Sequence, residues 1–229
     1  MFPGGPYDLS VLKDYEHHIA INVWNGQQDK FIDIRYRLRA QIDHWITISG
    51  LRPLRRCSLH MIDGNMIFAF AERWHAETSS FHLPFGEMAI TLDGVRGLLS
   101  IPCSGEFFTP PANVNEDLAI AAAVELLGVA YDEAVTKTRT NRSASYSFEW
   151  LKEVFFKKLH EGRCDCAARA YLLHLVGCTI LADKSFTLVS VKYQFLFQDL
   201  DTCGKWAWGP TALVVLYDYI IDSTLPATK

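Results

Sequence analysis

The stretch from Cys164 to Leu181 limits the fold of this chain more than any other part of the sequence. Apolar residues occupy nearly every helical position there, so a helix over these residues would present apolar side chains on all sides. In water, such a helix is stable only where other elements surround it. The sequence therefore predicts a helical protein whose core is built around residues 164–181.

Several other segments have apolar residues at spacings of three and four, which is typical of helices with one buried face. Asn115 and Gly128 bound one of these segments as caps, and Ser147 precedes another. Helices alternating with strands are absent, which argues against a doubly wound sheet. We therefore predict a mainly α, single globular helical domain of about eight helices. Helical patterns cover about 10–23, 30–48, 62–74, 92–99, 116–127, 132–137, 148–160, 164–181, 193–200 and 209–222.

The segment 72–91 has a different periodicity. Apolar and polar residues alternate over 81–83 and again over 87–91, and Pro84-Phe85-Gly86 between them is typical of a turn. Alternation on both sides of a short turn predicts one small β-hairpin near residues 80–91. Thr91 then caps the next helix. Elsewhere, the polar and basic residues 138–145 predict an exposed loop, and 185–191 a short extended segment.

Composition narrows the class of protein. The 229 residues are 49% hydrophobic and 21% charged, which is enough apolar surface for a sizeable core. The net charge is −4 with neutral histidines, so no overall positive field attracts nucleic acid. We expect no signal peptide and no membrane span. Six cysteines in a chain that does not need disulfides indicate an intracellular protein with reduced thiols.

Familiar catalytic motifs are missing from the sequence. It has no G-x-S-x-G nucleophile motif, no Gly-rich phosphate loop ending in Lys-Ser/Thr, and none of the GDxHG, GDxxD or GNHE strings of metal-dependent phosphatases. The best zinc constellation is His160, Cys164, Cys166 and His174, but Cys-x-Cys is not the usual paired spacing. We interpret these residues as buried thiols and a surface histidine. We expect no catalytic residue, no cofactor and no metal.

Four blocks of sequence together carry a resemblance. They are GGPYDLSVLKDYEHHIAINVWNG (4–26), Glu72-Arg73-Trp74 with Glu77-Thr78 and FHLPFGEMAITLDGVRGLLSIPCSG (81–105), ARAYLLHLVGCTILADKS (168–185), and DLDTCGKWAWGPTALVVLYDYI (199–220). In this order, and over nearly the whole chain, they resemble the plant mobile domain family. That family is also labelled aminotransferase-like and includes the maintenance-of-meristems (MAIN-like) proteins.

The resemblance implies a nuclear plant protein linked to transposable-element silencing, genome stability and meristem maintenance. It also implies a partner, or a fusion, of the phosphatase 7 long form group. Family members usually continue into a Gly-rich turn and a Trp-containing helix. We therefore expect residues 1–229 to be a plant mobile domain without that C-terminal segment. Our lead hypothesis is a non-enzymatic protein-interaction domain. The alternatives are a transposon-derived nucleic-acid-binding domain and, after it, a cryptic enzyme.

The aminotransferase-like label has its own requirements. A pyridoxal-phosphate enzyme needs a Schiff-base lysine, an acidic group at the pyridinium nitrogen and a phosphate cup. Lys184 is the nearest candidate for the lysine. We interpret it instead as a cation at a helix C-terminus, where the helix dipole favours positive charge.

Two sets of residues are candidates for binding. The first surrounds the hairpin, and we interpret it mainly as an Arg–carboxylate clasp that holds the hairpin against the preceding helix, with a recognition surface as the alternative. The second could contact phosphates if its members share one face, and is otherwise a solvated helix face and loop. Lys137, Arg139 and Arg142 form a further basic cluster. The first set is Glu72, Arg73, Trp74, Glu77, Thr78, His82 and Glu87, and the second is Arg35, Arg39, Arg52, Arg55 and Arg56.

Overall fold

The computed structural model describes residues 39–57, 69–141, 143–182 and 187–224. Within them the protein is mainly α, as the sequence predicts. The helix predicted at 10–23, the first part of that at 30–48 and most of that at 62–74 lie outside the described residues. The α-helices are α2 (Ala40–Ile48), α4 (Leu92–Leu99), α5 (Glu116–Leu127), α6 (Tyr131–Asn141), α7 (Phe148–His160), α8 (Cys164–Cys178) and α9 (Trp208–Thr224). Short 3-10 helices are η2 (Arg52–Arg56), η3 (Val191–Phe197) and η4 (Cys203–Lys205).

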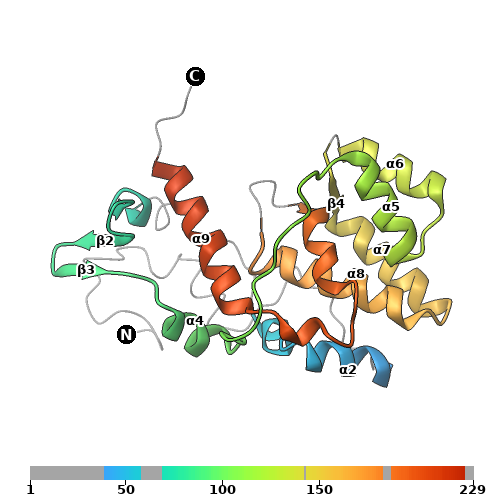
Figure 1. Ribbon diagram of the computed structural model, residues 1–229, viewed down its shortest axis with the longest axis horizontal. Coiled ribbons are helices and arrows are strands. Elements are labelled where there is room, and N and C mark those ends of the chain that lie inside the picture. Colours follow the sequence, from blue (N-terminus) through green and yellow to red (C-terminus); the bar gives the residue numbers. More distant parts are fainter. Residues whose placement is uncertain (1–38, 58–68, 142, 183–186, 225–229) are drawn as a thin grey trace, which may run out of the picture.

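Helix α8 lies at the centre of the core, which confirms the prediction for this stretch. It packs against α7, α2, α5, η3 and the strand β5 (Leu188–Ser190), so that nearly all of its residues are buried. The helix ends at Cys178, three residues before the predicted end, because Thr179 leaves the helical conformation at φ −120° and ψ −85°. We call α2, α5–α8 and η3 the helical bundle (Figure 1).

Capping side chains set the predicted helix ends. The Asn115 side chain accepts a hydrogen bond from the Leu118 amide at 2.9 Å and begins α5, and Gly128 ends it in the left-handed conformation at φ +66°. Ser147 and Thr91 begin α7 and α4 in the same way, each accepting from an amide three residues later. All four caps agree with the sequence prediction.

The predicted hairpin is present and belongs to a three-stranded antiparallel sheet. Strands β2 (Ser80–Leu83) and β3 (Gly86–Met88) form the hairpin, and β1 (Trp74–His75) pairs with the other edge of β2. The prediction that Trp74 lies in a helix is wrong. The helical turn before it ends by Ala71, and Trp74 pairs with Phe81 across the sheet. Helical spacing could not reveal this pairing, which depends on the chain turning back through residues 76–79.

A second, two-stranded sheet was not predicted. Strand β4 (Ser145–Ser147) pairs antiparallel with β5, which lies within the predicted extended segment 185–191. The exposed loop predicted over 138–145 is also wrong, because α6 continues to Asn141. Thr138 in this region is fully buried, and Lys137 forms an ion pair with Glu153 on α7. Tertiary contacts therefore stabilise a helix whose sequence is polar.

Helix α9 connects the bundle to the sheet (Figure 1). At its start, Trp208 is fully buried, stacks on Phe197 of η3, and donates a hydrogen bond to the Ser49 carbonyl at 2.8 Å. Further along, α9 packs against α4 and β1, and the Tyr217 hydroxyl donates to the Ile90 carbonyl at 2.6 Å. We call β1–β3, α4 and the part of α9 after Ala212 the hairpin lobe. No helix among the described residues is long and apolar enough to cross a membrane.

Candidate interaction surface

One face of the three-stranded sheet is aromatic and packs on α9. Trp74 and Phe81 are each 5% exposed and lie edge to face, with ring centroids 4.8 Å apart. Phe70 contacts Phe81 from the preceding helical turn, and the ring of Tyr217 on α9 lies 4.9 Å from Trp74. These rings hold the sheet against the rest of the protein.

The other face of the sheet is polar, because residues alternate between faces along β2. Thr78 Oγ1 lies 2.7 Å from Ser80 Oγ and 3.3 Å from Nε2 of His82. His82 stacks on His75 with ring centroids 3.6 Å apart, and its Nε2 lies 3.4 Å from a Glu87 oxygen. Three predicted site residues, Thr78, His82 and Glu87, are therefore in one network.

The remaining predicted residues near the hairpin are arranged differently. Trp74 belongs to the aromatic face, whereas Glu72 and Glu77 are exposed on the turns that flank β1. The Arg73 guanidinium donates to the Ala69 carbonyl at 2.8 Å. Among the described residues, the side chains that hold the sheet against the rest of the protein are thus aromatic. The expected Arg–carboxylate pair is not seen among them.

Large apolar side chains are exposed mainly outside the bundle. Eight of the ten that are exposed in the described residues lie between positions 70 and 107 or on α9. Leu98 on α4 is 86% exposed and Phe85 at the hairpin turn 81%. The place of Phe85 in the turn between β2 and β3 was predictable from the sequence, whereas its exposure was not. We call the following residues of the hairpin lobe the exposed apolar set: Phe85, Met88, Leu92, Leu98, Val214 and Leu216.

The predicted phosphate-binding arginines are spread over two elements. Arg39 immediately precedes α2 and donates to the Cys164 sulfur at 3.7 Å, and Arg55 on η2 pairs with Asp43 at 3.4 Å. Arg52 is exposed on η2. Arg35, like the Arg142 of the third cluster, lies outside the described residues, and only the backbone of Arg56 is described.

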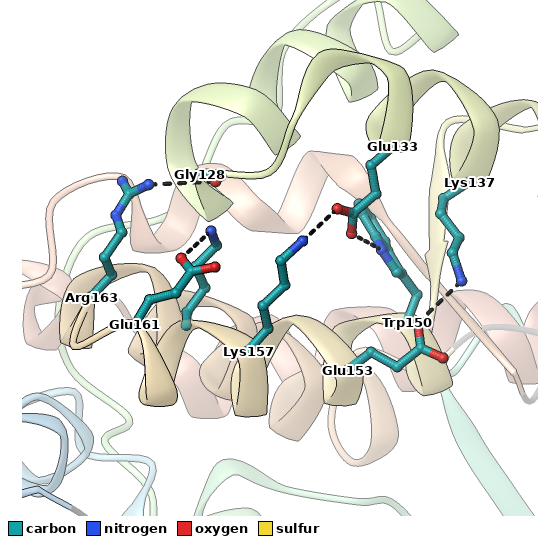
Figure 2. Close-up of polar contacts among 9 residues, drawn as sticks. Gly128, Glu133, Lys137, Trp150, Glu153, Lys157, Glu161 and Arg163 are labelled. Carbon is teal, nitrogen blue, oxygen red and sulfur yellow. Dashed lines mark hydrogen bonds and ion pairs between the residues drawn. The ribbon is translucent and has the colours of Figure 1, made fainter.

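Two ion pairs connect α6 to α7 among the described residues, Lys137 with Glu153 and Lys157 with Glu133 (Figure 2). Glu133 accepts hydrogen bonds from Lys157 at 2.8 Å and from the Trp150 indole at 3.1 Å. Burial by itself would raise the pKa of Glu133, but these hydrogen bonds and the Lys157 charge outweigh it and lower the pKa. On the same side, the nearly buried Lys158 pairs with Glu161 at 2.6 Å. The Glu133 contacts connect α6 to α7, whereas the Lys158–Glu161 pair lies at the C-terminal end of α7 itself.

The four residues considered as possible zinc ligands, His160, Cys164, Cys166 and His174, do not converge on one site. Among the described residues, no three His, Cys, Asp or Glu side chains are grouped so that they could hold a metal ion. His160 is exposed, whereas His174 is 4% exposed and packs against Phe148, so the surface histidine of the prediction can only be His160. None of the six cysteines is in a disulfide. Lys184, the candidate Schiff-base lysine, lies outside the described residues.

Comparisons with known proteins point to one group. A family model described as "Plant mobile domain" matches residues 50–223. Protein MAIN-LIKE 1 of Arabidopsis thaliana is 33% identical over 232 residues, which cover 96% of this chain and 45% of that protein. Protein MAINTENANCE OF MERISTEMS, from the same plant, is 30% identical over 224 residues, with 93% and 45% covered.

A third relative has a different name. The Serine/threonine-protein phosphatase 7 long form homolog of A. thaliana is 28% identical over 228 residues, which cover 93% of this chain and 16% of that protein. The chain thus spans less than half the length of each of these three relatives. No solved structure matches it significantly.

Proposed function

The chain belongs to the plant mobile domain family, and from this premise we propose that it is a non-enzymatic protein-interaction domain. Family membership was predicted from the four sequence blocks and is confirmed. We further propose that the protein acts in the plant nucleus, in transposable-element silencing, genome stability and meristem maintenance. The name of the relative MAINTENANCE OF MERISTEMS supports the last of these roles.

The observation that carries the proposal is the exposed apolar set. Folded proteins expose single apolar side chains routinely, but large ones concentrated in one region favour contact with another protein. Phe85 and Leu98, at 81% and 86% exposed, contribute little to the protein's own packing. Aromatic and aliphatic side chains of this kind are the usual anchors of protein interfaces.

The partner that we propose to test first is a phosphatase-7-long-form-like protein. A region similar to this chain lies within a relative that carries this name. The polar network of Thr78, His82 and Glu87 lies on the hairpin that carries Phe85. It would supply hydrogen-bonding groups beside the apolar anchors, as polar rims of interfaces do.

The test is co-precipitation from plant nuclei with the tagged chain. We expect the wild-type chain to enrich a phosphatase-7-long-form-like protein, and the double variant Phe85→Ser/Leu98→Ser to lose it. Phe107→Ser is the matched control, because Phe107 is also an exposed large apolar residue, at 72%, but lies outside the hairpin lobe and outside the exposed apolar set. Equal enrichment by the double variant and the wild-type chain would refute the role of the exposed apolar set.

A nucleic-acid-binding domain is the less favoured alternative. Two of the predicted arginines, Arg39 and Arg55, already contact groups of this chain. Binding to phosphates would have to compete with these contacts. Affinity for duplex DNA measured at several salt concentrations tests the alternative, because each phosphate contact steepens the fall of affinity with salt.

A further inference from the structure

A shallow groove of about 370 Å³ runs along the outward face of α5, on the bundle and not on the hairpin lobe. The inward face of the same helix is buried against α6, α8 and η3. The groove has an apolar middle and a carboxylate towards each end. Its lining residues are Asp117, Ile120, Ala121, Val124, Glu125 and Tyr131.

The middle of the groove is shaped to receive one large apolar side chain. Three large apolar residues line it, of which Ile120 is buried at 6% exposed, while Val124 and Tyr131 are 37% and 64% exposed. Ala121 has a small side chain, which allows another backbone to approach α5 closely. Positions 117, 121 and 124 follow the spacing by which one helix face packs against another helix.

The charges at the groove are uncompensated. Asp117 and Glu125 are eight positions apart, so their backbones lie about 12 Å apart along the helix axis. No ion pair of either carboxylate with a basic side chain is recorded among the described residues, whereas Glu133, Glu153 and Glu161 on the α6–α7 side each pair with a lysine (Figure 2). The groove therefore presents negative charge on both sides of an apolar centre.

We propose that this groove binds an amphipathic helix of a protein partner, one that carries a large aliphatic residue between two Lys or Arg residues. The aliphatic side chain fills the space between Val124 and Tyr131. The two basic residues, about eight positions apart on the partner helix, meet Asp117 and Glu125. This is helix-in-groove recognition. The charges determine specificity for the partner, and the apolar contact stabilises the complex.

The test uses a synthetic helical peptide with one Leu midway between two Lys residues placed about eight positions apart. Two matched peptides carry Glu in place of both Lys, or Ser in place of the Leu. Titration into the ¹⁵N-labelled chain gives both the affinity and the site. We expect the Leu/Lys peptide to shift the amides of Ala121, Val124 and Tyr131, and each matched peptide to bind roughly tenfold more weakly or worse.

Charge reversal on the protein makes the test specific. The double variant Asp117→Lys/Glu125→Lys changes exposed side chains, so its fold should be retained, and it should prefer the Glu peptide over the Lys peptide. An unchanged preference would overturn the proposal, as would shifts from the Leu/Lys peptide that fall mainly on the hairpin lobe. The Phe85→Ser/Leu98→Ser variant should bind the peptide normally, so failure here is distinct from failure of the proposed function.

Discussion

The helical bundle and the hairpin lobe bury their apolar residues to very different extents. In the bundle, Trp150, Leu151 and Phe155 are at most 1% exposed. In the hairpin lobe, Trp74 and Phe81 are buried, but Phe85 and Leu98 are more than 80% exposed. Apolar residues recur with helical or strand period in both regions. The difference in their burial therefore depends on how many other elements pack over them. α8 is surrounded by its neighbours, whereas, as far as the described elements go, the sheet and α4 are packed mainly against α9.

We interpret this difference as a division of roles, in which the buried residues support stability and the exposed apolar set supports the proposed recognition of a partner. The apolar core of the bundle is covered, and its exposed large apolar residues among the described ones, Val124 and Tyr131, line the groove on α5, so the buried residues of the bundle chiefly maintain the fold. The hairpin lobe, in contrast, has apolar side chains that are exposed to solvent. We expect the fold not to depend on these side chains. Substitutions in the two regions should therefore differ in what they change.

The largest effect on stability is expected from Trp150→Ala in the bundle. It removes a buried ring that packs on Tyr146 and deprives Glu133 of one of its two hydrogen-bond donors. We expect a loss of about 3–5 kcal/mol in the free energy of unfolding, measured by urea denaturation. Trp150→Phe should cost less, because it restores a ring. A loss below 1 kcal/mol for Trp150→Ala would contradict the view of a tightly packed bundle.

The second prediction concerns acid sensitivity of the bundle. Burial, with a smaller contribution from the Lys152 charge, lowers the pKa of His174 from 6.5 to about 4. Between these pH values the unfolded chain binds a proton at this site and the folded chain does not. The free energy of unfolding should therefore decrease by about 3 kcal/mol as the pH is lowered from 6.5 to 4. Urea denaturation at several pH values between 7 and 4 measures this loss of stability.

His174→Gln is the control for this prediction, because it removes the titrating group. The variant should lose the His174 part of the pH dependence between 6.5 and 4, whatever its stability at pH 7. The carboxylate of Glu133, whose pKa is lowered, affects stability in a different pH range. Its contribution to the free energy of unfolding is lost as the pH falls below about 4.5. Identical slopes for the wild-type chain and His174→Gln above pH 4.5 would disprove the assignment.

A smaller effect is expected from Trp74→Ala in the hairpin lobe, roughly 2–3 kcal/mol. Trp74 packs on Phe81 and Tyr217, and its indole nitrogen has no hydrogen-bond partner among the described residues. Trp74→Phe should therefore be nearly neutral, unlike Trp150→Phe. Hydrogen exchange should show faster opening of β1–β3 in Trp74→Ala while α8 stays protected. Equal loss of protection in both regions would mean that the lobe and the bundle unfold together.

The smallest effect on stability is expected from Phe85→Ser and Leu98→Ser. Both side chains lie mostly in solvent, so we expect changes within about 0.5 kcal/mol, measured by thermal or urea denaturation. A destabilisation above 1 kcal/mol by either would show that its side chain supports the fold. The case for the hairpin lobe as a recognition surface would then fail.

Local signals in the sequence were sufficient for much of the fold. Asn115, Gly128 and Ser147 predicted the ends of α5 and the start of α7, because a cap acts on backbone groups within one turn. The alternation around Pro84-Phe85-Gly86 predicted the hairpin for a similar reason. The polar α6 was predicted too short, since the residues that stabilise it, among them Glu153, lie on another helix.

The candidate site was only partly predictable. Thr78, His82 and Glu87 were identified from their place in the hairpin and do lie together. The exposure of Leu98 was not foreseen, because its position in a short apolar helix is equally consistent with burial. Nor did the apolar pattern of 116–127 reveal that its outward face forms a groove.

The sequence by itself determined that this chain is mainly helical, that the segment 164–181 is central, that a hairpin lies near residues 80–91, and which family the chain belongs to. Only the tertiary structure decided which apolar faces remain uncovered and which charges find partners. The physical reason is that helix and strand periods are properties of neighbouring residues. Burial and ion pairing depend instead on elements far away in the chain, which local patterns do not specify.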